Sequence, residues 1–111
     1  MSGTEELIAR LWEQFRPLAE RRIGLIEAYV GGREVVLLSE VPTPWGGDAR
    51  TQARQAAHDL VGALGSYGRP DGSRLARDVE HLLLGDAAAD EVPGRDELSR
   101  LLAALRSEVT R

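Results

Sequence analysis

His58 is the residue of this chain best suited to carry out chemistry, because of what lies one and two helical turns from it. Arg54 and Gln55 precede it by four and three residues, and Gly62 and Gly65 follow it by four and seven, so a helix would place all four on its side. A glycine inside a helix costs about 1 kcal/mol relative to alanine. Chance explains two of them beside one histidine poorly, and one interpretation is that they leave the ring open to a partner surface. The alternative is that they let a neighbouring helix approach closely or soften the end of this one.

The chemistry that this arrangement suits is phosphoryl transfer. An exposed imidazole is largely neutral near pH 7 and carries a lone pair, so it is a nucleophile that needs no activating base. Arg54 could hydrogen-bond the oxygens of a phosphoryl group on the ring. The sequence shows no acidic cluster for Mg²⁺ and no nucleotide-binding loop beside His58. We therefore expect no metal site and no cofactor in this chain, and a partner that brings both the metal and the phosphoryl donor.

Composition excludes several other kinds of chemistry. The 111 residues include 18 acidic and 14 basic side chains, and every basic one is arginine. Without lysine the chain can form neither a P-loop nor a Schiff base, and without cysteine it has no disulfide or thiolate nucleophile. The net charge of −4 and the scattered arginines argue against nucleic-acid binding.

The length and hydropathy of the chain predict one domain over residues 1–111. No apolar run approaches the roughly 18 residues of a membrane span, and the N-terminus is acidic where a signal peptide would be basic and then apolar. We expect a cytoplasmic protein that is a monomer and has no membrane partner.

The helix that must position His58 is predicted from Ala49 to about Tyr67. Asp48 is a good N-cap, and Gly68 followed by Pro70 ends the helix. Its apolar residues form a stripe roughly opposite His58, so the histidine is predicted to face solvent. The stripe consists of Ala53, Ala56, Ala57, Leu60, Leu64 and Tyr67.

Apolar residues at helical spacing predict the remaining elements, and β-branched residues are few. A short helix begins after Thr4 and ends or kinks at Pro17. Further helices are predicted over residues 18–30, from Pro70 or Asp71 to about Leu83, and over residues 95–110. Short connections make neighbouring helices antiparallel. The predicted fold is all-α, an antiparallel four-helix bundle with an additional N-terminal helix.

Residues 33–41 (REVVLLSEV) are the one stretch that could form a strand. An unpaired strand leaves its backbone unsatisfied, so we favour a further helical turn or two, with a strand that pairs across a homodimer as the alternative. Residues 42–47 and 85–94 are predicted loops.

Two consecutive segments resemble a known family. Residues 57–68 (AHDLVGALGSYG) are similar to the signature of histidine-containing phosphotransfer (HPt) domains, A-H-x-L-[KA]-G-[SA]-x-G-x-[FY]-G. Residues 69–80 (RPDGSRLARDVE) are similar to the start of the family's next helix, G-x-P-x-G-S-x-L-A-R-x-x-E. The predicted helical bundle is also the fold of that family.

The resemblance implies that His58 accepts a phosphoryl group from the aspartate of a response-regulator receiver domain and passes it to another. Gly62 keeps the docking surface open, and Gly65, Gln55 and Val61 support it. The family does not bind ATP, and the receiver domain supplies the Mg²⁺ and most of the catalysis. Receiver domains and a hybrid histidine kinase are the implied partners.

The chain differs from many family members in lacking a lysine close to the histidine. Many members have a lysine three residues after the histidine and a subgroup has it one residue after, where this chain has Val61 and Asp59. A cation near the phosphoryl group must then be an arginine. The candidates are Arg54, Arg69 and Arg74.

Two other functions remain open. The missing lysine is compatible with a degenerate docking module that binds receiver or kinase domains without carrying phosphate. The phosphoacceptor hairpin of a sensor kinase is disfavoured, because that hairpin reads His-Glu-x-x-Thr/Asn-Pro, whereas Asp-Leu-Val-Gly follows His58 and no ATP-binding segment follows. The second histidine, His81, is interpreted as a surface residue rather than a metal ligand or a second phosphorylation site.

Overall fold

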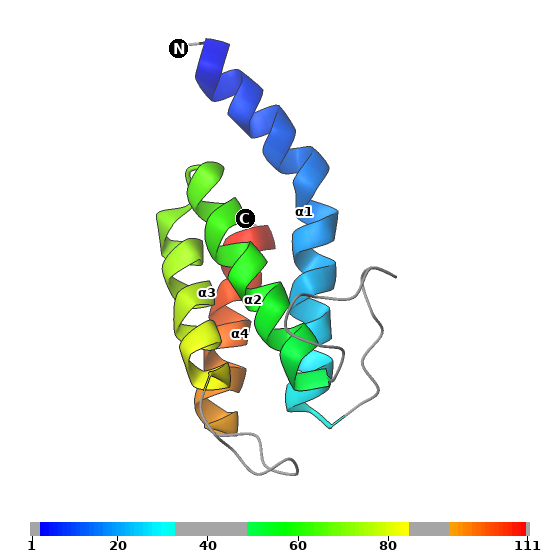
Figure 1. Cartoon of the computed structure of the whole chain (residues 1–111). Coiled ribbons are helices and arrows are strands. Elements are labelled where there is room, and N and C mark those ends of the chain that lie inside the picture. The colour runs from blue at the N-terminus through cyan, green and yellow to red at the C-terminus, as the bar shows by residue number, and fades with distance from the viewer. Residues whose placement is uncertain (1–2, 33–48, 85–93, 111) are drawn as a thin grey trace.

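The computed structural model describes residues 3–32, 49–84 and 94–110, which form four helices (Figure 1). The helices are α1 (Gly3–Val30), α2 (Ala49–Ser66), α3 (Pro70–Leu83) and α4 (Arg95–Thr110). No strand occurs in these ranges, which confirms the all-α class. The colour gradient of Figure 1 shows α1 and α3 running in one direction and α2 and α4 in the other. The predictions for residues 33–47, for the Asp48 cap and for nearly all of the 85–94 loop lie outside the described residues.

The helices form a ring in which each packs against two others. Helix α2 contacts α1 and α3, and α4 contacts the same two helices from the other side. Apart from Trp12 the buried core is aliphatic, and the alanines of α2 let its neighbours approach closely. The predicted stripe on α2 is confirmed, since its five residues up to Leu64 are buried. The other large buried side chains include Ile23, Ile26, Val79, Leu83, Leu98, Leu105 and Val109.

One continuous helix, α1, covers the first 28 described residues, with Pro17 inside it. The prediction of a separate N-terminal helix is therefore wrong. Pro17 removes one backbone donor but leaves the helix intact, because residues on both sides of it, Trp12 and Ala19, are buried in the bundle. In Figure 1 the N-terminal part of α1 leans away from the direction of the rest, as a proline inside a helix causes.

The connection between α2 and α3 is a Schellman turn, the motif in which a left-handed residue ends a helix. Gly68 has a φ of +72°, which favours glycine. The amide of Arg69 donates to the carbonyl of Leu64 at 2.8 Å, and that of Gly68 donates to the carbonyl of Gly65 at 3.3 Å. Pro70 then occupies the first turn of α3, where its missing donor is harmless. This short turn sets the register of α3 against α2.

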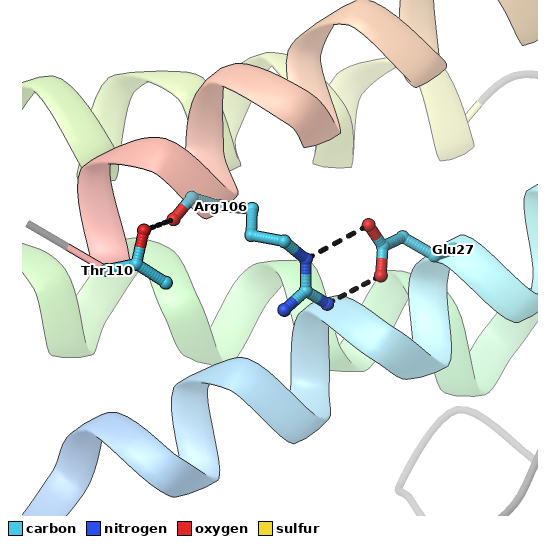
Figure 2. Close-up of polar contacts among 3 residues, drawn as sticks. All are labelled: Glu27, Arg106 and Thr110. Carbon is cyan, nitrogen blue, oxygen red and sulfur yellow. Dashed lines mark hydrogen bonds and ion pairs between the residues drawn. The ribbon is translucent and has the colours of Figure 1, made fainter.

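An ion pair joins α1 to α4 (Figure 2). Nε of Arg106 donates to Oε2 of Glu27 at 3.2 Å, and its Nη2 donates to Oε1 at 2.5 Å. These bonds raise the pKa of Arg106 above its ordinary value, against a smaller opposing effect of burial. The pair is bidentate, a geometry that fixes orientation as well as distance. Arg106 lies one turn before Thr110, whose hydroxyl bonds the Arg106 carbonyl at 2.9 Å.

An aromatic cluster holds the N-terminal half of α1 against the turn between α2 and α3. The rings of Trp12, Phe15 and Tyr67 lie within 5.2 to 6.0 Å of one another, centroid to centroid. The guanidinium of Arg69 lies 4.2 Å from the centroid of Trp12, a cation–π contact. The same guanidinium donates to the backbone carbonyl of Glu108 at 2.8 Å, so it also ties the turn to α4.

Candidate functional site

His58 projects from the side of α2 that faces away from the core. Its side chain is 55% exposed, while its neighbour Ala57 is fully buried. The prediction that the ring faces solvent is confirmed. The imidazole is therefore accessible to another macromolecule while its helix is held firmly by packing.

A carboxylate from the next helix holds the ring. Nδ1 of His58 lies 2.8 Å from Oε2 of Glu80 on α3. An ionised carboxylate only accepts hydrogen bonds, so Nδ1 carries the proton and donates it. In the neutral ring this leaves the lone pair on Nε2, the nitrogen on the other side of the imidazole. The Glu80 side chain is only 15% exposed, and a partly buried carboxylate keeps its orientation better than a solvated one.

Sequence reasoning did not assign a role to Glu80. The residue stands in the segment that resembles the family, 22 positions after the histidine. The spacing from the Schellman turn was the available signal, because a tight turn between two antiparallel helices places residues at similar distances from it side by side.

The two glycines near His58 differ in what surrounds them. A Cβ added to Gly62 would meet nothing within 4 Å, and one added to Gly65 would lie in ordinary contact, at 3.6 Å, with Oγ of Ser73. Both glycines are exposed. The close helix approach considered as an alternative occurs instead at Gly72, where a Cβ would lie 3.1 Å from Cδ1 of Leu64. Packing therefore does not require a glycine at position 62.

Other predicted site residues flank His58 on α2. Gln55 donates to Oδ1 of Asp59 at 2.9 Å, and Arg22 of α1 lies 3.7 Å from the other oxygen of that carboxylate. These residues connect the site to α1. On the α3 side the carbonyl of Val61 accepts a 2.7 Å hydrogen bond from Oγ of Ser73, and the Val61 side chain packs at the edge of the core.

The three arginines considered as cations lie in different places. Arg54 is half-buried on α2, one turn before His58. Arg69 is held by Trp12 and the Glu108 carbonyl at the end of the bundle, so it does not reach the histidine face. Arg74 pairs with Asp71 at 2.9 Å in an exposed contact on α3.

Within the three described ranges no group of three or more histidine, cysteine or acidic residues could hold a metal ion. His81 is exposed on α3. None of the described helices is both long and apolar enough to cross a membrane.

A helical bundle that displays one histidine, oriented by a carboxylate, on an open face has the architecture of a phosphotransfer module. The chain belongs to the Hpt domain family, whose model matches residues 10–108. Domains of this family transfer phosphoryl groups on histidine in phosphorelays, where they interact with receiver domains and kinases, and they are phosphocarrier modules rather than enzymes. No match was found among curated proteins or among solved structures.

Proposed function

We propose that this protein is a phosphocarrier of a two-component phosphorelay and that Nε2 of His58 is the atom that carries the phosphoryl group. The single observation that carries the proposal is the 2.8 Å contact between Nδ1 of His58 and Glu80. It directs the proton to one nitrogen and the nucleophilic lone pair to the other, on a side chain that is more than half exposed.

The transfer needs no general base, because no proton has to leave the attacking nitrogen. The neutral imidazole attacks the phosphorus of an aspartyl phosphate on a receiver domain, so the N–P bond forms at Nε2 while the bond from phosphorus to the aspartate oxygen breaks. The leaving group is the aspartate carboxylate, which needs no proton. The phosphorylated ring keeps its Nδ1 proton and becomes cationic. Glu80 accepts a hydrogen bond from that proton and stabilises the positive charge. The reverse reaction passes the group to a second receiver.

The docking surface in this proposal is the α2 face around His58. Gly62 and Gly65 place no side chain on that face one and two turns after His58, and Gln55 and Val61 lie beside it. Arg54, one turn away, is a candidate for contact with the phosphoryl oxygens. The receiver domain brings the Mg²⁺ that its own aspartyl phosphate requires. The exchange takes place in the cytoplasm, with the protein as a monomer that donors and acceptors approach in turn.

Labelling by a receiver domain tests the proposal. The protein is incubated with Mg²⁺ and a receiver domain charged by acetyl phosphate, and we expect an acid-labile, base-stable phosphoryl group on the wild type. His58→Gln should abolish the label, whereas His81→Gln, which changes an exposed histidine on α3, should retain it. A wild type that binds several receivers and stays unlabelled would instead support the docking module without phosphate, the function with which the absence of lysine at positions 59 and 61 is compatible.

A further inference from the structure

Three residues of α3 form a row along the side of the helix that meets α2 near His58. Ser73, Arg77 and Glu80 are spaced four and three residues apart, so they share one side of the helix. Both ends of the row contact α2, with Oγ of Ser73 bonding the Val61 carbonyl at 2.7 Å and Glu80 bonding His58 at 2.8 Å. Arg77, in the middle, therefore lies beside the part of α2 between Val61 and His58.

Arg77 also borders an open depression at the surface. The depression has a volume of about 390 Å³ and is lined by Gly65, Pro70, Ser73, Arg74 and Arg77. Its α2 wall is a glycine, so no side chain separates the basic α3 wall from the α2 face. Of the two arginines in its walls, Arg74 is already paired with Asp71 at 2.9 Å, which leaves Arg77 as the cation beside the glycine wall.

Arg77 differs from the other arginines near the site in its availability. It is exposed, and among the described residues its side chain makes no ion pair or hydrogen bond, whereas Arg74 is paired with Asp71 and Arg69 is held by Trp12 and Glu108. An exposed guanidinium on a long stem can move to a new anion without breaking an existing pair.

We propose that Arg77 binds the phosphoryl group on His58, with its guanidinium donating to the phosphoryl oxygens. This proposal rests on the proposed function. Of the candidate cations, this assigns the role to a residue of α3 instead of to Arg54 of α2, the helix on which Val61 occupies the position of the family's lysine. One helix thus contacts the phosphorylated ring at two points, with Glu80 on Nδ1 and Arg77 on the phosphoryl group. A guanidinium suits this role because its fork donates to two oxygens at once.

The test measures the equilibrium between phosphohistidine and receiver aspartyl phosphate for the wild type, Arg77→Gln, Arg77→Lys, Arg74→Gln and Arg54→Gln. This ratio of free species does not depend on how tightly the receiver docks. Arg77→Gln should lower the phosphohistidine share about fivefold, the size expected for an exposed charge-assisted contact, and Arg77→Lys should recover part of it. Arg74→Gln, the matched control from the same depression, should stay within about twofold of the wild type because it leaves the contact intact.

An NMR measurement on the arginine side chains accompanies the equilibrium measurement. The Nε–H resonance of Arg77, assigned by its absence in Arg77→Lys, should shift on phosphorylation, and that of Arg74 should not. An unchanged equilibrium in Arg77→Gln overturns the proposal, as does an equal loss in Arg74→Gln, which would reflect general charge. A loss found only in Arg54→Gln would assign the cation to α2 and also overturn it. If His58 takes no label in any variant, the proposed function fails, and that result is distinct from all of these.

Discussion

Glu80 and His58 lie on different helices, 22 residues apart, and their side chains meet at 2.8 Å between Oε2 and Nδ1. The contact joins the same two helices as the hydrogen bond from Ser73 to the Val61 carbonyl. The Schellman turn at Gly68 sets the register that brings both pairs together. The orientation of the imidazole therefore depends on the packing of α3 against α2, and a change on α3 should alter the chemistry of a residue on α2.

Replacement of Glu80 should slow phosphoryl transfer to His58 without unfolding the bundle. Glu80→Ala removes both the acceptor and the charge, and we expect a rate about tenfold lower, the lower end of the effect of a hydrogen bond to a charged group. Glu80→Gln keeps an acceptor but not the charge, so its rate should be intermediate. Stopped-flow or quench measurements with a charged receiver domain give the rates, and far-UV circular dichroism checks the fold.

A structural readout distinguishes this positioning role from a general loss of packing. In ¹⁵N NMR spectra of the neutral ring, the wild type should favour the tautomer with the proton on Nδ1, and Glu80→Ala should move the population toward the Nε2 proton. Equal tautomer populations in the two proteins would contradict the role assigned to Glu80.

Gly62 offers a pair of substitutions that separate docking from stability. Gly62→Ala should stabilise the protein by about 0.5–1 kcal/mol, because alanine has the higher helix propensity and a Cβ meets nothing within 4 Å. It should leave phosphotransfer nearly unchanged. Gly62→Gln should also fold, but its side chain would cover the surface next to His58 and impair transfer from a receiver. Urea denaturation measures the first effect and transfer kinetics the second.

The control is to label Gly62→Gln and the wild type with a small phosphoryl donor instead of a receiver domain. Phosphoramidate needs no docking surface, so it should label Gly62→Gln about as fast as the wild type. Normal transfer from the receiver domain in Gly62→Gln would show that the open face has no role in docking.

The parts of the fold that the sequence predicted correctly depend on local signals. The helix that carries His58 ends where Gly68 adopts a positive φ, and its buried stripe follows from a 3.6-residue period. The exposure of His58 follows from that stripe. The end or kink at Pro17 was predicted from a local rule as well. The helix does not end there, because Trp12 and Ala19 on either side of the proline are both packed in the bundle.

Only the part of the site that lies on one helix could be predicted from the sequence, because only that part depends on local spacing. His58, Gly62 and Gly65 stand out on one helix at helical spacing. Glu80 and Arg77 come to the site through the register between two helices, and no spacing along a single element shows that register. His58 lies ten residues before Gly68 and Glu80 twelve after it, so distance from the turn alone would have admitted Asp78, at ten, as well as Glu80.

The ion pair between Glu27 and Arg106 should contribute modestly to stability. Its side chains are 32% and 39% exposed, so solvent screens the pair, and we expect Arg106→Ala to lower the free energy of unfolding by about 1 kcal/mol. Because Glu27 and Arg106 are 79 residues apart, the pair links the first helix to the last. A double-mutant cycle with Glu27→Ala in low and high salt measures it. A coupling energy of zero at low salt would show that the pair does not stabilise the bundle.

Trp12 is expected to hold the N-terminal half of α1 on the bundle. Its side chain is 3% exposed, and Trp12→Ala should lower the free energy of unfolding by about 3 kcal/mol, as loss of a large buried side chain does. Trp12→Phe should cost much less, about 1 kcal/mol. It keeps most of the aromatic contact and removes a buried indole N–H that has no acceptor in the described part of the chain, and such a group is itself destabilising.

Urea denaturation monitored by circular dichroism gives both values for the Trp12 variants. Because Trp12 lies at the end of the bundle with Tyr67 and Arg69, away from the contact of His58 with Glu80, both variants should still accept a phosphoryl group while folded. Equal destabilisation by Trp12→Phe and Trp12→Ala would mean that the indole nitrogen is satisfied in solution and that the loss arises from its hydrogen bond instead of from packing.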